Sequence, residues 1–185
     1  DFKNKLFSEV NYIMHMASIA SPHFYRKFPL ETIEANVDGL KNILNYYKDK
    51  NVHLLYFSSS EIYGDPPKNK IPTAEDFNGN VSCIGPRSCY DAAKRFCETL
   101  CYYYSLIYKI NIKIVRPFNN YGPGLDINDK RLPADLANSI IKNKDIKIFS
   151  NGKPTRSYCY ISDAVTAYLL ALVYPSFEIF NVGNA

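Results

Sequence analysis

Tryptophan is absent from the sequence and glycine is scarce, with eight residues among 185. The glycines stand at positions 39, 64, 79, 85, 122, 124, 152 and 183. No G-x-G-x-x-G or G-x-x-G-x-x-G run can be built from these positions. Such a run forms the loop with which many nucleotide-binding folds hold a diphosphate. The sequence therefore excludes a glycine-rich phosphate loop within these 185 residues.

Long hydrophobic runs and clusters of basic charge are lacking as well. The longest apolar candidate, Ala164 to Tyr174, ends at Pro175 and is too short to span a bilayer. The formal net charge is +4, but the basic residues are scattered, whereas a nucleic-acid binder usually shows a basic stripe. We therefore expect neither a membrane nor a nucleic acid among the partners.

The five cysteines do not form a metal-binding pattern. There is no CxxC and no paired histidine, which are the spacings typical of zinc sites. An odd number of cysteines and the lack of a signal-like segment favour reduced thiols in a cytoplasmic protein. We therefore expect no bound metal.

The apolar pattern predicts strands that alternate with helices. Hydrophobic residues make up 46% of the chain and charged residues 22%, as in folded domains. Predicted strands occupy residues 10–17, 52–57, 112–115, 146–149 and 179–182, and predicted helices occupy 29–50, 89–109, 132–142 and 162–173. Residues 63–88 form a long loop rich in Gly, Pro and Asn. This alternation is typical of an α/β fold with a parallel sheet.

Three polar clusters follow predicted strands. They are Ala17 and Ser18, the segment 58–61, and the segment 116–120. Ligands of open parallel sheets bind at the carboxyl ends of the strands. The sequence therefore predicts a binding site where these clusters meet.

Tyr90 and Lys94 are the sharpest candidates for catalysis. Four residues apart on a predicted helix, they share one face. An ammonium near a phenol lowers the phenol's pKa from about 10, so the tyrosine becomes able to act as a general base toward a hydroxyl. The hydroxyl of Ser60 would hydrogen-bond the same substrate oxygen. By spacing alone the pair could also arise by chance, because the chain contains 16 tyrosines.

The string from Ile84 to Arg95, IGPRSCYDAAKR, resembles the active-site helix of the extended short-chain dehydrogenase/reductases, and within them that of the UDP-glucuronate decarboxylases. Five further stretches agree with that family in order and spacing: HMAS at 15–18, NVDGL at 36–40, SSEIYGDP at 59–66, RPFNNYGP at 116–123 and GKPTR at 152–156. The resemblance covers essentially the whole chain.

The resemblance implies a Rossmann-like doubly wound parallel sheet with the start of a smaller substrate-binding lobe. Residues 1–118 would be a partial NAD-binding domain without its first strands and glycine loop. Residues 119–185 would be a partial sugar-nucleotide region with elements that return to the sheet. Family members carry the glycine loop on their first strand, so the chain would correspond to the middle of a longer protein.

The resemblance also implies roles for named residues. Tyr90 would be the base at the sugar 4-hydroxyl, while Lys94 would bind the nicotinamide ribose of NAD and Ser60 would assist. The remaining implied site residues are Ala17 and Ser18 beside the cofactor, Glu61 near the sugar C5, Asn119 at the sugar nucleotide, Arg156 at its diphosphate, and Arg87 and Arg131 as further substrate-binding residues. Asn36 would mainly brace loops.

Ser60 and Glu61 decide between reactions within the family. Dehydratases typically place Asp before this Glu, and simple 4-epimerases usually lack the Glu, so the pair favours decarboxylation of UDP-glucuronate. Glu34 stands where decarboxylases tend to have a basic residue, which leaves a 4,6-dehydratase and a 4-epimerase as alternatives. A non-catalytic protein that senses dinucleotides or binds a partner is the alternative of another class. Family members usually dimerise, which here would use residues 30–48 and 90–108.

Overall fold

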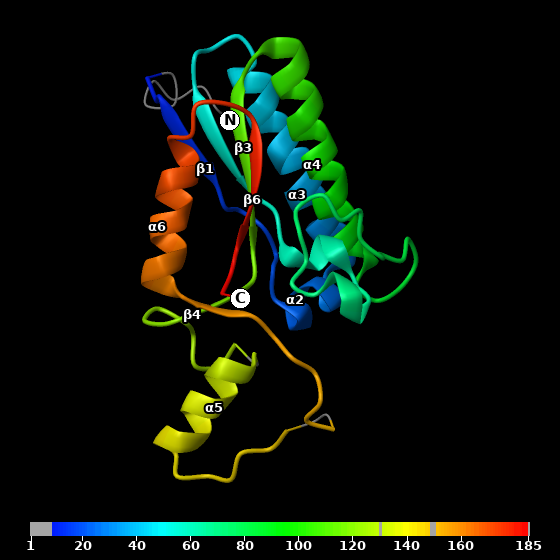
Figure 1. Ribbon diagram of the computed structural model, residues 1–185, viewed down its shortest axis with the longest axis vertical. Helices are drawn as coiled ribbons and strands as arrows, with labels where there is room; N and C mark the ends of the chain where they lie inside the picture. The colour runs from blue at the N-terminus through cyan, green and yellow to red at the C-terminus, as the bar shows by residue number, and fades with distance from the viewer. Residues whose placement is uncertain (1–8, 130, 149–150, 185) are drawn as a thin grey trace.

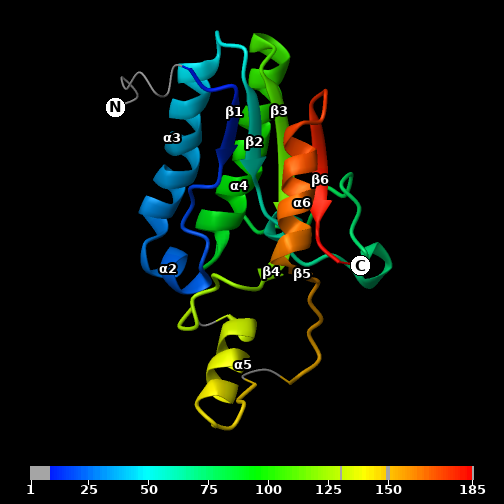
Figure 2. The same ribbon diagram turned by 90° about the vertical axis from the view of Figure 1, so that its left-hand side faces the viewer.

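A four-stranded parallel sheet forms the centre of the computed structural model, which describes residues 9–129, 131–148 and 151–184 (Figure 1). The strand order is β1-β2-β3-β6, and every neighbouring pair is parallel. The strands are β1 (Tyr12–His15), β2 (His53–Phe57), β3 (Asn111–Pro117) and β6 (Glu178–Val182). Their carboxyl ends meet at one edge of the sheet (Figure 2). The predicted α/β class is confirmed.

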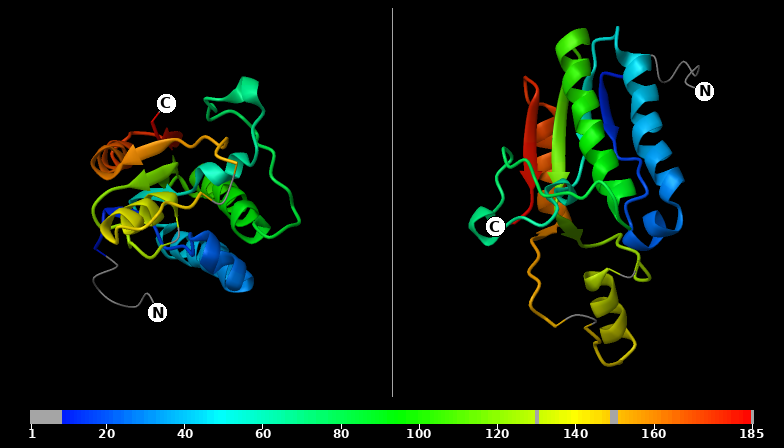
Figure 3. Two further views of the ribbon diagram at one scale, coloured as in Figure 1. Left: turned by 90° about the horizontal axis from the view of Figure 1, so that it is seen from below. Right: turned by 90° about the vertical axis from the view of Figure 1, so that its right-hand side faces the viewer.

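Helices cover both faces of this sheet. The helices of the described residues are α2 (Pro22–Lys27), α3 (Pro29–Tyr47), α4 (Ser88–Tyr108), α5 (Leu132–Ile141) and α6 (Ile161–Leu172), with short 3-10 helices η1 (Ser60–Tyr63) and η2 (Lys68–Lys70). Helices α3 and α4 lie side by side on one face, and α6 lies on the other (Figure 3). A two-stranded parallel sheet, β4 (Asn119–Tyr121) with β5 (Tyr158–Tyr160), lies beyond the carboxyl edge, and α5 lies below it (Figure 1).

The residues of β2 divide the core into two layers. Successive side chains of a strand point to opposite faces of the sheet. Leu54 and Tyr56 accordingly pack under α3 and α4, whereas Leu55 and Phe57 pack under α6. All four are buried, which explains why this strand reads as a continuous apolar run. The first layer is completed by Leu40 and Leu44 of α3, Cys97 and Cys101 of α4, and Ile112 and Ile114 of β3.

The two long helices begin and end where local chemistry favours it. Pro29 is the first residue of α3, where a missing backbone N–H costs no hydrogen bond. Helix α4 ends at Tyr108, and the next residue, Lys109, adopts the left-handed conformation with φ 59° and donates its N–H to the carbonyl oxygen of Ser105. The helix therefore presents its first turn, with Tyr90, at the carboxyl edge of the sheet.

The predicted order of elements is confirmed with one exception. Residues 146–148 form no strand, because no described strand pairs with them and the side chains of Ile146 and Ile148 are exposed; Phe149 lies outside the described residues. The short elements α2, β4 and β5 were not predicted. The predicted loop at 63–88 holds η2 and a bridge between Gly64 and Asn80.

Three further findings concern membranes, metals and thiols. Within the described ranges, no helix is long and apolar enough to cross a membrane. The same residues hold no group of three His, Cys, Asp or Glu side chains that could bind a metal ion. All five cysteines are free, and Cys97, Cys101 and Cys159 are buried.

Candidate functional site

The site lies at the carboxyl edge of the sheet, where the first turn of α4 meets the end of β2. Tyr90 is 5% exposed and Lys94 is 3% exposed, so both polar side chains are enclosed by the fold. The ring of Tyr90 stacks on that of Tyr25 from α2, with centroids 5.2 Å apart and an angle of 13° between the planes. The short helix α2 therefore forms one wall of the site.

Lys94 is fastened to the end of β2. Its Nζ donates to the carbonyl oxygen of Phe57 over 2.7 Å and lies 5.7 Å from the centroid of the Tyr90 ring. Burial of the ammonium lowers the pKa of Lys94 to about 8. The neighbouring His15 is also buried, and burial, followed by the charge of Lys94, lowers its pKa to about 4. Lys94 and Tyr90 lie on the same side of α4, as their spacing predicted.

The phenol of Tyr90 does not have the lowered pKa that the sequence predicted. Burial raises the pKa of Tyr90, and this effect outweighs a hydrogen bond with the side chain of Ser59, which lowers it. The prediction was wrong because helical spacing gives the position of the lysine but not the loss of water around the phenol. In this protein without ligands, Tyr90 is therefore a neutral hydrogen-bonding group at pH 7.

The side chain of Ser59, rather than that of Ser60, lowers the pKa of Tyr90 against the effect of burial. The Ser59 hydroxyl also caps η1 by accepting from the backbone N–H of Glu61 over 3.2 Å. Ser60 is the first residue of η1 and is partly exposed. The strand ends at Phe57 as predicted, but η1 begins at Ser60, so sequence reasoning missed Ser59, although it belongs to the same serine run.

Glu61, Arg87 and Asp91 form a charged cluster beside the tyrosine. Arg87 forms an ion pair with Glu61, and its Nε lies 3.3 Å from the Asp91 Oδ2. The side chains of Arg87 and Glu61 are 40% and 42% exposed. Burial raises the pKa of Asp91 in spite of the guanidinium. The structure therefore brings together two predicted site residues, Glu61 and Arg87, and adds Asp91.

Glu98, which sequence reasoning did not place in the site, connects α4 to Arg116 of β3, the first residue of the predicted 116–120 cluster. Glu98 and Arg116 form a double hydrogen bond, with Arg116 Nη2 2.7 Å from Glu98 Oε2 and Nε 3.0 Å from Oε1. Their side chains are 12% and 7% exposed. The available signal was the position of Glu98, four residues after Lys94 on the same helix face.

The model of the NAD dependent epimerase/dehydratase family matches residues 2–183. The chain belongs to this family.

Relatives within the family are similar over the entire chain. UDP-glucuronic acid decarboxylase 6 of Arabidopsis thaliana is 39% identical over 184 residues, which are 100% of this chain and 53% of the relative. UDP-glucuronic acid decarboxylase 1 of Xenopus tropicalis is 35% identical over the same share of this chain and 43% of its own length. The chain thus spans about half the length of these curated relatives.

A solved structure from the family shows the same fold. UDP-glucose 4-epimerase of Thermotoga maritima, crystallised with UDP-glucose, superposes with a TM-score of 0.87 at 27% identity. The match covers 97% of this chain and 58% of that one. The predicted Rossmann-like sheet is therefore confirmed.

The residues predicted to line the cofactor lie at the end of β1. Ala17 is exposed, and the Ser18 hydroxyl donates to the side-chain oxygen of Asn36 over 2.9 Å. Asn36 is buried, and its amide donates to the carbonyl oxygen of Thr32 over 2.7 Å. Asn36 therefore braces the segment after β1, as the resemblance implied.

The remaining predicted substrate residues lie apart from Tyr90, around the smaller sheet and α5 (Figure 1). The Asn119 amide donates to the carbonyl oxygen of Ser157 over 3.0 Å and so joins β4 to the segment before β5. Arg131 pairs with Asp129, at 2.5 Å between Nη2 and Oδ2. Arg156 is exposed, and its guanidinium donates to the neighbouring carbonyl oxygen of Thr155. Their predicted contacts with a substrate stay predictions.

Proposed function

We propose that the protein uses NAD to modify a nucleotide sugar through a 4-keto intermediate, and that the reaction is decarboxylation of UDP-glucuronate to UDP-xylose. The observation that carries this proposal is the buried group of Tyr90, Lys94 and Ser59 with Glu61 at its edge. Supporting it, the curated relatives that match the full chain are UDP-glucuronic acid decarboxylases.

The side chains at the edge of the sheet fit one end of NAD. The Lys94 ammonium has three N–H donors and gives one to the Phe57 carbonyl oxygen, so further donors are available for ribose hydroxyls. The chain has no glycine-rich run for the diphosphate. We therefore assign to these residues the nicotinamide ribose and not the diphosphate. NAD, when bound, takes up the hydride from the sugar C4 and later returns it.

Tyr90 would first release its own proton to water, would then as the phenolate take the proton of the sugar 4-hydroxyl during oxidation, and would give it back when the ketone is reduced. The hydrogen bond with Ser59 stabilises negative charge on the phenol oxygen, and the cation of Lys94 lies on the same side of α4. Oxidation at C4 makes the C6 carboxylate a β-keto acid, which loses CO2 and leaves its electron pair on C5 as an enolate. Glu61 would then take up a proton from water and deliver it to C5, and Arg87 beside it holds that side chain in place.

A proton NMR time course with UDP-glucuronate tests the reaction in the complete encoded protein. We expect UDP-xylose and CO2, and a turnover that falls by about 10²- to 10⁴-fold in Tyr90→Phe, because a general base is lost. Tyr121→Phe, which changes an exposed tyrosine of β4, is the matched control. Turnover of a neutral UDP- or dTDP-hexose with none of UDP-glucuronate would replace the decarboxylase by a dehydratase or an epimerase.

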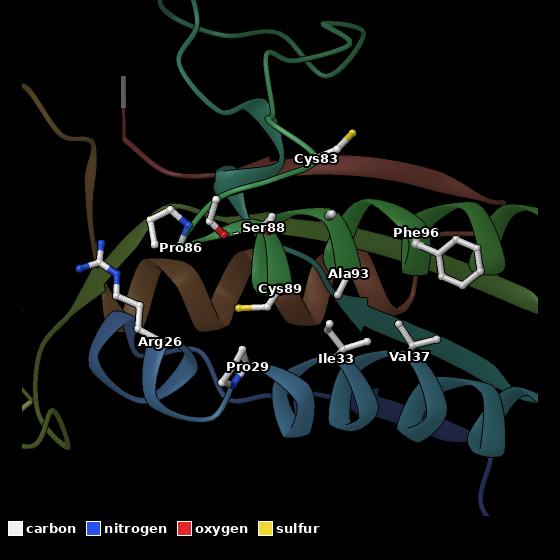
Figure 4. A pocket seen from close by; sticks show the side chains of 12 residues that line it. Arg26, Pro29, Ile33, Val37, Cys83, Pro86, Ser88, Cys89, Ala93 and Phe96 are labelled. Atoms are coloured by element: carbon white, nitrogen blue, oxygen red, sulfur yellow. Dashed lines mark hydrogen bonds between the residues drawn. The ribbon is translucent and has the colours of Figure 1, made fainter.

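We also propose that two copies associate through α3 and α4. An apolar groove of about 700 Å³ lies between these helices and the segment before α4 (Figure 4). Ile33 and Phe96 line the groove and are 40% and 51% exposed, and Ile107 farther along α4 is 64% exposed. Exposed apolar patches of this kind mark interaction sites. A second copy would cover them in a four-helix contact.

Sedimentation velocity tests the dimer. Phe96→Glu, which places a charge in the groove, should shift the protein to a monomer. Leu170→Glu changes an apolar side chain of α6 that is 65% exposed on the opposite face, and this variant should stay dimeric. A monomeric wild-type protein at micromolar concentration would contradict the proposal.

A further inference from the structure

The strand end that carries Ser59 is fastened to α4 at two points. The Lys94 Nζ donates to the carbonyl oxygen of Phe57 over 2.7 Å, and the Ser58 hydroxyl donates to Glu98 Oε1 over 2.5 Å. Lys94 and Glu98 are four residues apart and lie on one face of the helix. Ser59 follows directly after Ser58, and its side chain favours the ionised form of Tyr90 in the first turn of the same helix. The distance between Ser59 and Tyr90 therefore depends on how this strand end is held.

Glu98 is itself immobilised by Arg116. Both oxygens of the carboxylate accept from the guanidinium, over 2.7 and 3.0 Å, and such a double hydrogen bond fixes the orientation of both groups. The same guanidinium donates from Nη1 to the Tyr63 hydroxyl over 2.7 Å and to the Glu75 carbonyl oxygen over 2.8 Å. These hydrogen bonds of Glu98 and Arg116 thus join β2, α4 and β3 to the long loop after η1.

We propose that Glu98 is a positioning residue, which holds Ser59 against Tyr90 through the hydroxyl of Ser58 and is kept in place by Arg116. This inference rests on the proposed function, in which the hydrogen bond between Ser59 and Tyr90 assists proton transfer. The position of the reacting groups matters steeply, since a misplacement of about 1 Å can cost about 10²-fold in rate. Glu98 does not reach the phenol and acts only through its neighbours.

The position of Glu98 has a second consequence, on charge. Its carboxylate is one of the groups that favour the charged form of Lys94, opposing the effect of burial. The thiols of Cys97 and Cys101, whose pKa values burial raises, also face the lysine from α4, and His15 faces it from β1. We therefore expect that removal of the negative charge from Glu98 will lower the pKa of Lys94 further.

Two variants separate position from charge in the complete encoded protein. Ser58→Ala removes the hydroxyl contact and leaves the ion pair of Glu98 and Arg116 intact, whereas Glu98→Gln removes the charge. With UDP-glucuronate, each should lower kcat by about tenfold or more and change KM less than about twofold, because the groups act on the reacting centre and not on binding. Asp76→Asn neutralises an exposed carboxylate of the same loop and should leave both constants unchanged.

The pH dependence of kcat distinguishes a change of charge from a loss of packing, because a loss of packing would leave it unchanged. In Glu98→Gln the fall of kcat at high pH should begin at a lower pH than in the wild type. In Ser58→Ala this fall should begin at the wild-type pH. The pKa of Lys94 is measured directly by NMR after reductive ¹³C-methylation, with the signal assigned by its loss in Lys94→Arg. It should fall in Glu98→Gln alone.

Two results overturn the inference. One is a wild-type kcat in both variants, and the other is an unchanged pKa of Lys94 in Glu98→Gln. A wild-type protein without turnover of any nucleotide sugar refutes the proposed function instead. In that case the NMR titration still tests the coupling between Glu98 and Lys94, so the two failures are distinguishable.

Discussion

Replacement of Lys94 by methionine should change how the stability of the protein depends on pH. Lys94 is 3% exposed, and its charged form is disfavoured by burial, which lowers its pKa from 10.5 to about 8. Below pH 8 the side chain is charged in both the folded and the unfolded protein, and the cost of burying the charge is fully present. As the pH rises from 8 to 10.5, the lysine loses its proton in the folded protein first, and the cost disappears.

The size of the effect follows from this gap. Each unit of pKa is worth about 1.4 kcal/mol, so the full difference is roughly 3 kcal/mol. Most of this change in the free energy of unfolding occurs between pH 7 and pH 10, where we expect roughly 2–3 kcal/mol. Wild-type stability should therefore rise by this amount relative to that of Lys94→Met over the range. No correction for solvent screening is needed for so deeply buried a group.

Urea unfolding at pH 7, 8, 9 and 10 measures this difference. From pH 7 to pH 10, the free energy of unfolding of the wild type should rise relative to that of Lys94→Met by roughly 2–3 kcal/mol. This change is expected whatever the difference between the two proteins at pH 7. Lys41→Met, which changes an exposed lysine of α3, is the control and should follow the wild type at every pH. Parallel curves for Lys94→Met and the wild type would refute the reasoning, since they would mean that Lys94 titrates alike in the folded and unfolded protein.

Other predictions concern the serine run and the glycines. Ser59→Ala should lower kcat by about tenfold, as expected for a lost hydrogen bond worth about 1.4 kcal/mol at the reacting centre. Ser60→Ala should lower kcat less. A larger effect of Ser60→Ala in steady-state kinetics would contradict this assignment. Gly64→Ala should destabilise the protein by about 1–3 kcal/mol, because φ is +64° and a Cβ would lie 2.1 Å from a backbone carbonyl oxygen. Gly39→Ala should stabilise it by about 0.5–1 kcal/mol, since this helical glycine has open space around it; equal urea midpoints for the two variants would refute the steric account.

Much of the sheet and of its two long helices was predictable from the sequence. The apolar run at 52–57 predicted a strand buried on both faces, and the structure places β2 at the centre of the core. Residues 146–149 carry a similar but shorter apolar pattern. A strand needs a partner for its backbone hydrogen bonds, and no described strand pairs with 146–148. Pattern alone cannot tell these two cases apart.

The candidate site was predictable only in part. Tyr90 and Lys94 were found by spacing, because α-helical geometry places residues four apart on one face whatever surrounds them. The role of Ser59 was not found in this way, because the start of η1 at Ser60 decides which serine hydroxyl faces α4. The direction of the Tyr90 pKa was also missed, since it depends on burial against Tyr25 of another helix.

The sequence by itself therefore determined the alternation of strands and helices, the shared face of Tyr90 and Lys94, and the lack of a glycine-rich loop, because each is a property of neighbouring residues. Only the tertiary structure decided which polar atoms meet and how much water they lose. The bond from Tyr63 to Asn181, for example, joins residues 118 positions apart. Contacts over such separations exist only after the sheet has formed, and burial then sets the pKa of each group enclosed by it.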